Sequence, residues 1–156
     1  MSVTITVGDT KPAQRKFERM KRRVQVPDRA WKRVGIYLSR EVNRQFSTRG
    51  AQFGTPWKPL AISTKIEKRR LGFTPAPLVR TGRLKRGFTS RPMDIYETRG
   101  AVAKFGSSYK IAAYQHHGTR RNGRQHIPAR PILKVTPVMR REIRDILERY
   151  IVGDAV

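Results

Sequence analysis

The sequence predicts an α+β fold in which a small antiparallel sheet is packed by a long helix from the N-terminal half and by a C-terminal amphipathic helix. Three observations lead to this fold class: helical periodicity after Asp28, an extended hairpin-like run in the middle of the chain, and a second amphipathic segment after Thr136. With 156 residues and 37% hydrophobic content, the chain is long enough for one ordinary domain and too short for two. We therefore treat residues 1–156 as one domain.

The N-terminal segment, residues 1–27, is predicted to form a strand followed by a basic arm. Residues 2–7, "SVTITV", alternate apolar and hydroxyl side chains, which is typical of a half-buried strand. Residues 14–26 are rich in Lys and Arg and place Phe17 and Met20 on one helical face. We expect this segment to be a solvated basic helix or arm.

A long helix is predicted to begin near Asp28, which would serve as the N-cap or as an early carboxylate, and to end at Gly50. Its apolar side chains are Trp31, Val34, Ile36, Leu38, Val42 and Phe46. The other face carries Arg29, Arg33, Arg40 and Arg44, which we expect to face solvent. This helix would be the scaffold of the fold.

Two short helical fragments are predicted in the Gly- and Pro-containing region that follows. Residues 64–67, "TKIE", have the form of a capping box, in which Thr64 would begin a short basic helix that ends at Gly72. Thr81 would likewise cap a turn through "GRLKRG". Both predictions depend on hydroxyl side chains that satisfy free backbone N–H groups.

From Phe88 to Phe105 the pattern becomes extended and hairpin-like, with its turn at "TRG". Pro92 indicates an edge or a bulge in this run. Residues 108–118 are ambiguous but suit a short helix stopped by Gly118. Residues 119–125, "TRRNGRQ", are predicted to form a basic loop.

The last helix has clear signals at both ends: Thr136 as the N-cap, Pro137 at the first helical position, and Gly153 past the end. Its apolar stripe is predicted to contain Val138, Met139, Ile143, Ile146, Leu147, Tyr150 and Ile151. The preceding segment, "HIPARPIL", contains two prolines that each fix φ near −65° and push the residue before them toward extended backbone. We therefore predict a rigid extended segment from Ile127 to Leu133.

The net charge of +24, from 35 basic and 11 acidic residues, predicts either a polyanion or an acidic protein as a partner. A basic surplus spread over a solvated surface, with no specific partner, remains open as well. The chain contains no zinc-finger, RNP-type or KH-type signature that would favour a known nucleic-acid-binding module. The candidate polyanion-contacting residues are Arg22, Arg23, Lys68, Arg69, Arg70, Arg120, Arg121 and Arg124.

Several other classes of protein are disfavoured by composition. There is no cysteine, which excludes disulfides and thiolate metal sites. No apolar run approaches the roughly 18 residues of a membrane span, and the first residues do not have the pattern of a signal peptide. We expect a soluble protein that is not exported by this route and that does not bind a membrane.

The grouping that most resembles a catalytic site is "HHGTRRNGRQH", with His116, His117, Asn122 and His126. Histidines and basic charge suggest a metal-dependent nuclease, yet no Asp or Glu lies between Thr98 and Arg141 to hold a hard cation. Histidines that lie on the surface or that anchor the loop are the alternative that we favour. There is no Gly-rich phosphate loop and no G-x-S-x-G elbow. We therefore predict no enzyme, no metal and no cofactor.

Four short motifs occur in order along the chain: "GTPWKPL", "LVRTGRL", "YQHHG" and "IPARPIL". In their order and spacing, residues 45–150 resemble the phage virion morphogenesis family, also called tail completion proteins. The family-typical positions are candidate assembly-interface or family-motif residues, which the resemblance implies to be structural rather than catalytic: Trp57, Pro59, Leu60, Leu78, Thr81, Gly82, Leu84, His117, Gly118, Ile127, Pro128, Arg130, Pro131 and Leu133. The arginine-rich residues before position 45 depart from the family pattern.

The resemblance implies a non-enzymatic virion component of the neck or of the head-proximal tail end, needed for tail completion and head–tail joining. The implied partners are further copies of the chain in a ring, expected to be a hexamer, and tail terminator, tail tube or head connector proteins. Genomic DNA would be a non-specific partner through its phosphates. The protein would assemble in the host cytoplasm and reside in the virion. The alternatives are a freestanding basic nucleic-acid-binding protein and, less expected, a His-dependent nuclease.

Two interpretations of the proline-containing segment stay open at this point. The segment could bury Ile127, Ile132 and Leu133 against a neighbouring subunit while Arg130 meets a carboxylate or a backbone carbonyl. Alternatively, it could be the start of a strand that packs the last helix on the sheet, with Arg130 in an internal salt bridge.

Overall fold

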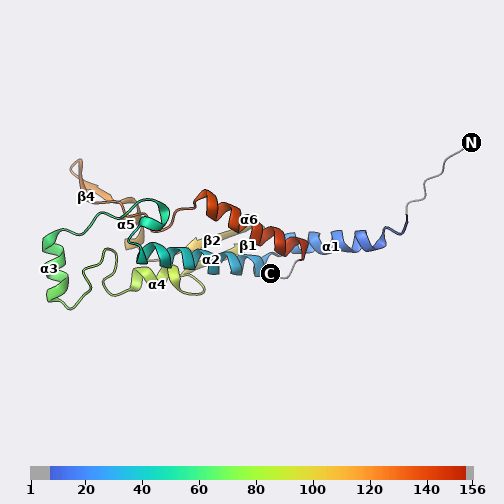
Figure 1. Ribbon diagram of the computed structural model, residues 1–156, viewed down its shortest axis with the longest axis horizontal. Coiled ribbons are helices and arrows are strands. Elements are labelled where there is room, and N and C mark those ends of the chain that lie inside the picture. Colours follow the sequence, from blue (N-terminus) through green and yellow to red (C-terminus); the bar gives the residue numbers. More distant parts are fainter. Residues whose placement is uncertain (1–7, 154–156) are drawn as a thin grey trace, which may run out of the picture.

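The computed structural model describes residues 8–153 of the chain. These residues form an elongated body whose two ends are built from different parts of the sequence (Figure 1). The helices are α1 (Lys11–Gln25), α2 (Asp28–Ser47), α3 (Ile62–Arg70), α4 (Arg83–Thr89), α5 (Ile111–His117) and α6 (Pro137–Val152), with a short 3-10 helix η1 (Ala51–Phe53). The strands are β1 (Ile95–Arg99), β2 (Val102–Gly106), β3 (Thr119–Arg121) and β4 (Arg124–Ile127). The strand predicted for residues 2–7 lies outside the described residues.

Helix α2 is the central element, as predicted, and α6 lies along it (Figure 1). Asp28 is an early carboxylate in its first turn, while the N-cap position is occupied by Pro27. Ala30, Val34, Leu38 and Val42 recur every four residues and are at most 5% exposed, which defines the buried face. The four arginines predicted to face solvent, Arg29, Arg33, Arg40 and Arg44, are all exposed.

Helix α2 ends at Ser47, before the predicted end at Gly50, because the chain adopts a Schellman motif one residue earlier than the glycine. Arg49 takes the left-handed conformation with φ of 51°, and the N–H of Gly50 donates to the carbonyl of Gln45 at 2.9 Å. Gly50 then has φ of 99°, and a Cβ there would lie 2.6 Å from Cδ1 of Trp57. The glycine therefore lets the loop fold back and bring Trp57 onto the helix.

The capping signals of α6 are confirmed. Thr136 accepts a hydrogen bond from the N–H of Met139 at 3.2 Å, Pro137 is at the first position, and Gly153 follows the helix with φ of 101°. Met139 and Ile146 are buried, but Val138, which was predicted to share their stripe, is 62% exposed. The reason is geometric, since a residue next to Met139 in sequence is rotated by about 100° around the helix.

The two short helices begin without side-chain caps, so both hydroxyl-cap predictions are wrong. Helix α3 starts with Ala61 at the N-cap position, which places Thr64 inside the helix. A residue with helical backbone cannot act as the cap, which has non-helical dihedral angles. Helix α4 starts after Gly82, whose φ of 77° makes the turn that Thr81 was expected to cap.

The α+β class is confirmed, but the strands form two separate two-stranded antiparallel sheets. In the first, β1 pairs with β2 across the predicted "TRG" turn, although its strands start later than Phe88, which belongs to α4. Pro92 lies before β1 rather than in it. This hairpin packs on α2, where a Cβ at Gly35 would lie 3.1 Å from the ring of Phe105.

The predicted basic loop at residues 119–125 is instead a hairpin, in which β3 pairs with β4. Asn122 and Gly123 form its turn, with φ of 50° and 73°. An Asn-Gly pair is the typical sequence of a two-residue hairpin turn, because both residues tolerate positive φ. Residues 111–117 form the short helix α5, and Gly118 ends it as predicted.

The apolar core consists of two clusters that share α2. The motif cluster comprises Val42, Phe46, Trp57, Leu84, Phe88, Ala112 and Ile132. The second cluster comprises Val34, Leu38, Phe53, Met93, Met139 and Ile146. Leu133 packs against both clusters. The segment that carries the two prolines therefore joins the end of the molecule that contains the motif cluster, which we call the motif end, to the helix pair α2 and α6.

Candidate functional site

The segment "HIPARPIL" is fixed by hydrogen bonds to three other parts of the chain. The carbonyl of Pro131 accepts from Nε2 of Gln45 and from Nε1 of Trp57, each at 2.9 Å. The N–H of Ile132 donates to Nδ1 of His116 at 3.2 Å. Ile132 itself is completely buried. The rigid segment therefore joins α2, the first motif and α5 at one point.

Arg130 is buried, with 5% of its surface exposed, and its partners are neutral. Its Nε donates to the carbonyl of Lys58 at 3.0 Å, its Nη1 lies 3.5 Å from Oε1 of Gln115, and its N–H donates to the carbonyl of Gln115 at 2.8 Å. Burial lowers the pKa of its guanidinium from the ordinary value. The segment is thus held within its own chain, but it does not start a strand, because β4 ends at Ile127. Arg130 has no carboxylate partner among the described residues and forms no salt bridge there.

The histidine grouping does not form a metal site. Across residues 8–153 no three His, Cys, Asp or Glu side chains are placed to hold an ion together. His116 uses Nδ1 to accept the N–H of Ile132, and burial, followed by the nearby charge of His117, lowers the pKa of His116. His117 and His126 are exposed. His116 therefore anchors the proline-containing segment, while His117 and His126 are surface residues.

The four motifs come together in the fold although they are far apart in sequence. Trp57, Leu84 and Arg130 are buried. Eight further positions are partly buried: Leu60, Leu78, Gly82, Gly118, Ile127, Pro128, Pro131 and Leu133. Only Pro59, Thr81 and His117 among these family-typical positions are exposed. Trp57, Leu84 and Arg130 therefore build the fold, while the other motif positions keep part of their surface exposed.

Gly118 shows why the third motif requires a glycine. Its φ is 75°, and a Cβ there would lie 2.7 Å from the carbonyl oxygen of Ile127 and 2.8 Å from the nitrogen of Ala129. The backbone of the fourth motif thus passes directly over this residue. Any side chain at position 118 would separate the third motif from the fourth.

A cavity of about 560 Å³ opens beside the motif cluster, and we call it the motif groove. Its lining includes Lys68, Phe73, Leu78, Tyr109 and Arg130. Nζ of Lys68 donates to the carbonyls of Ala76 and Val79, so this lysine ties α3 to the loop before α4. Burial, followed by the charge of Arg80, lowers the pKa of Lys68.

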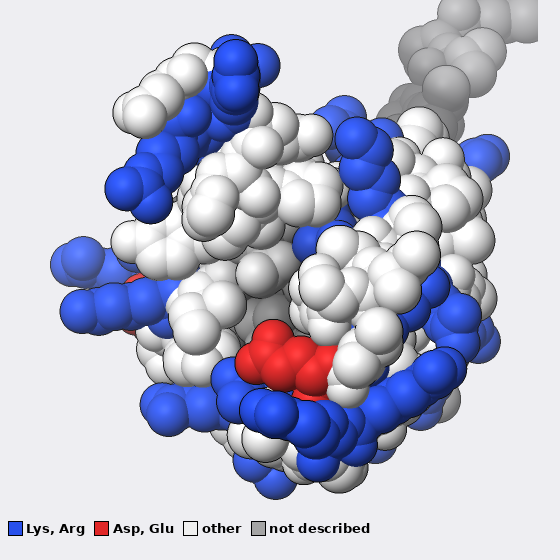
Figure 2. Space-filling model, turned by 90° about the vertical axis from the view of Figure 1, so that its left-hand side faces the viewer, with Lys and Arg blue, Asp and Glu red and all other residues white. Residues whose placement is uncertain are grey.

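The candidate polyanion-contacting residues do not form one patch. Arg69, Arg70, Arg120, Arg121 and Arg124 are exposed on α3 and on the β3–β4 hairpin, at one end of the molecule. Figure 2 views that end and shows Lys and Arg around a hollowed centre. Arg22 and Arg23 lie on α1, at the other end. Two of the candidates have internal partners, because Lys68 binds the carbonyls described above and Nη1 of Arg23 lies 3.4 Å from the carbonyl of Ile151.

Helix α3 presents apolar side chains outward, which sequence reasoning missed. Thr64, Glu67 and Lys68 line the motif groove. Ile62 and Ile66 are 75% and 60% exposed. Their i, i+4 spacing in the sequence is the signal that places them on one helix face. Helix α3 therefore places Thr64 and Lys68 toward its own domain, while Ile62 and Ile66 face solvent together with Arg69 and Arg70.

Within residues 8–153, no helix is long and apolar enough to cross a membrane. A comparison with protein-family models matches residues 8–152 to the model of the phage virion morphogenesis family. The match includes the arginine-rich residues before position 45, which the motifs alone had left outside the family pattern. Searches of curated proteins and of solved structures found no match. Since the matched range covers nearly the whole chain and contains all four motifs, the chain belongs to the phage virion morphogenesis family.

Proposed function

We propose that this protein is a structural component of the neck or head-proximal tail end of a phage, where it forms a ring and is required for tail completion and head–tail joining. Family membership supports a structural or assembly role in a phage virion rather than an enzymatic one. The ring and its location are the finer part of the proposal. Tail terminator, tail tube or head connector proteins are the expected neighbours.

The observation that carries this proposal is the outward apolar face of α3. Transfer of an exposed Ile side chain into an interface stabilises association by about 1.5–3 kcal/mol before the costs of binding are subtracted. Ile62 and Ile66 are adjacent on one helix face and can enter the same pocket of a neighbour. On the side of α3 that lines the motif groove, Lys68 donates a hydrogen bond to the carbonyl of Ala76. This contact holds the helix against its own domain, so its outward face is preorganised for binding. We assign this face to the contact with the next subunit of the assembly.

The test is complementation of a phage that lacks the gene, with tails and joined particles counted by electron microscopy. Replacement of both isoleucines, Ile62→Asp with Ile66→Asp, is expected to leave separate heads and unfinished tails. The matched control is Val102→Asp on β2, since Val102 is also 60% exposed but lies outside α3. Normal yields of joined particles from the double variant would overturn the assignment of α3.

The ring itself is tested by the solution mass of the purified protein from light scattering, alone and after incubation with isolated tails. A ring-sized species in either sample is expected for the wild type and not for the double variant. A protein that stays monomeric in both samples while joined particles still form would overturn the ring.

A further inference from the structure

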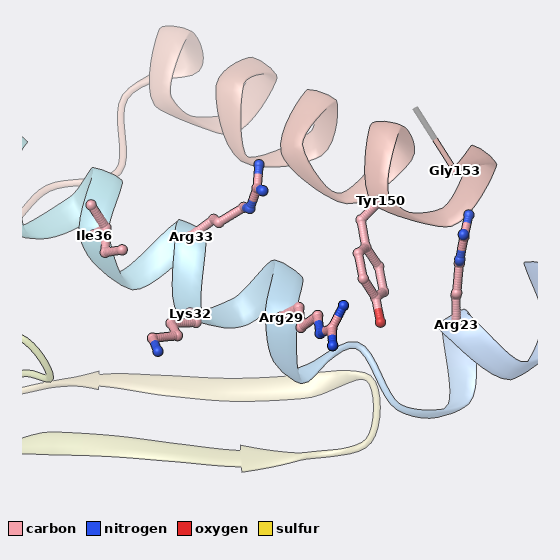
Figure 3. A pocket seen from close by; sticks show the side chains of 7 residues that line it. All are labelled: Arg23, Arg29, Lys32, Arg33, Ile36, Tyr150 and Gly153. Carbon is pink, nitrogen blue, oxygen red and sulfur yellow. The ribbon is translucent and has the colours of Figure 1, made fainter. Parts of the chain in front are cut away.

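A second cavity, of about 500 Å³, lies between α1, α2 and the end of α6, far from the motif groove. We call it the arm groove. It is lined by Arg23, Arg29, Lys32, Arg33, Ile36, Tyr150 and Gly153. Figure 3 shows Tyr150 extending from α6 toward α2, with Arg29 on one side of its ring and Arg23 on the other. Four cations from two helices therefore line one concavity.

Among the described residues, the cations of the arm groove have no acidic partners. Within residues 8–153, none of Arg23, Arg29, Lys32 and Arg33 forms an ion pair. Arg23 lies 6.0 Å from the centre of the Tyr150 ring, and the Tyr150 hydroxyl donates to the carbonyl of Val26 at 3.2 Å. These two contacts fix α1 relative to α6. The like charges repel one another across the groove, and an anion bound between them removes that repulsion.

The positive charge continues along α1. A neighbouring cavity of about 370 Å³ is lined by Lys16, Arg19, Met20, Arg23, Val152 and Gly153, so it shares Arg23 and Gly153 with the arm groove. Lys16, Arg19 and Arg23 follow one face of α1 over about 10 Å. A strand of duplex DNA carries one phosphate per about 3.4 Å along the helix axis, so this length faces about three phosphates.

We propose that the arm groove and its extension along α1 bind the phosphate backbone of nucleic acid without sequence preference. The groove offers charge and hydrogen-bond donors but few apolar anchors, with Ile36 and the Tyr150 ring as its main apolar contacts. A protein partner needs buried apolar anchors to offset the cost of ordering, whereas backbone binding derives its free energy from the release of counterions. This inference rests on the groove alone and does not require a ring or a location at the neck.

The first test is fluorescence anisotropy of the full chain with a labelled DNA duplex over a range of salt concentrations. The triple variant Arg29→Gln, Lys32→Gln, Arg33→Gln is compared with Arg120→Gln, Arg121→Gln, Arg124→Gln, which removes the same charge from the β3–β4 hairpin. The groove variant is expected to lose about tenfold or more in affinity at about 100 mM salt and to lower the salt slope by about 2 to 3. The hairpin variant should change the affinity less than about threefold.

The outcomes separate the proposal from its rivals. No binding of the duplex by the wild type would overturn the proposal. An equal loss of affinity in the two triple variants would mean that diffuse charge accounts for the binding, and it would overturn the assignment to the arm groove. Poly-glutamate that displaces the duplex at equal charge concentration would assign the groove to an acidic protein segment instead. A single-stranded probe that binds as tightly as the duplex supports backbone binding and extends it to single strands.

A second measurement requires no variant. Lysine acetylation of the wild-type chain, read by mass spectrometry, is expected to be slowed at Lys16 and Lys32 by bound duplex DNA. Lys104 is the internal control, because it lies on β2 outside both cavities and its side chain is 72% exposed. Equal rates at Lys32 with and without DNA would overturn the proposal even if the protein binds DNA elsewhere.

Discussion

The motif end of the molecule and the opposite end, where α1 meets the end of α6 and which we call the arm end, are stabilised by different kinds of contact. At the motif end, the carbonyl of Pro131 accepts from two buried side chains, Gln45 and Trp57, and the completely buried Ile132 lies beside them. At the arm end, α1 has no buried residue and is joined to α6 by surface contacts of Arg23 and Tyr150. Packing and buried hydrogen bonds fix the first end, while the second keeps its charges in contact with solvent. Both ends lie inside the family match.

The largest expected effect is at Trp57. Trp57→Ala removes a buried indole that forms a T-shaped pair with Phe46, with 5.2 Å between the ring centroids, and it also removes a hydrogen-bond donor to Pro131. We expect the free energy of unfolding to fall by about 3–5 kcal/mol, measured by urea denaturation. The matched control is Phe17→Ala on α1, where the side chain is 68% exposed and the loss should stay below about 0.5 kcal/mol. Similar losses in the two variants would contradict the contrast between the ends.

Glycine substitutions separate a crowded turn from an open one. Gly118 and Gly54 have the same φ of 75°, but no atom would lie within 4 Å of a Cβ at Gly54. Gly54→Ala should cost about 1 kcal/mol, which is the cost of a left-handed alanine. Gly118→Ala should cost about 2 kcal/mol more, because the ψ of 173° at Gly118, against 7° at Gly54, gives a backbone that essentially only glycine adopts, and because the backbone of Ile127 and Ala129 has to move. Thermal denaturation of both variants measures the difference, and equal midpoints would refute the close approach.

The amide of Gln45 offers a test of buried polar contacts. Its Oε1 accepts from the N–H of Phe53 at 3.2 Å while its Nε2 donates to Pro131. Gln45→Leu leaves the N–H of Phe53 without that partner, and we expect a loss of about 1–3 kcal/mol in the free energy of unfolding. Asn43→Leu is the control on the exposed side of the same helix and should change stability little. A neutral Gln45→Leu variant would mean that the two hydrogen bonds contribute no net stability.

Acid is expected to weaken the motif end through His116. Burial lowers its pKa below the ordinary 6.5, so the unfolded chain binds the proton more readily than the folded chain. The contribution of His116 to stability is therefore complete above about pH 6.5 and is lost as the pH falls from there toward the lowered pKa. Unfolding measured at pH 7.5 and pH 5 should show this decrease, and His116→Gln should reduce it. A pH dependence unchanged by His116→Gln would assign the effect to another group.

The smallest expected effect is at the arm. Arg23→Gln removes a contact of 3.4 Å to the carbonyl of Ile151 and a cation–π contact, both near the surface. We expect a change of about 0.5 kcal/mol or less in the free energy of unfolding. A loss of several kcal/mol would show that α1 is part of the cooperative core. The arm end would then depend on its contacts as strongly as the motif end does.

Sequence patterns predicted the long elements and the family, and failed at short-range alternatives. The cap of α6 at Thr136 was predictable because a single side chain satisfies a local N–H. The β3–β4 hairpin was predicted as a loop although its Asn122-Gly123 turn is a strong hairpin signal. The box at Thr64 failed because the helix starts earlier, at Ile62. Several residues near the start of a helix can occupy its N-cap position, and the local sequence does not show which of them does.

By itself, the sequence determined the two long helices, the β1–β2 hairpin, the two prolines that restrict the segment before α6, and the excess of positive charge. These properties depend on the 3.6-residue period, on turn chemistry and on proline, all of which act within a few residues. Only the tertiary structure decided that the exposed basic side chains lie at both ends of the molecule. It also decided that the carbonyl of Pro131 accepts hydrogen bonds from both Gln45 and Trp57 and that Arg130 donates to the carbonyl of Lys58. Such pairings join residues more than 70 positions apart, and no local pattern specifies which buried donor meets which acceptor.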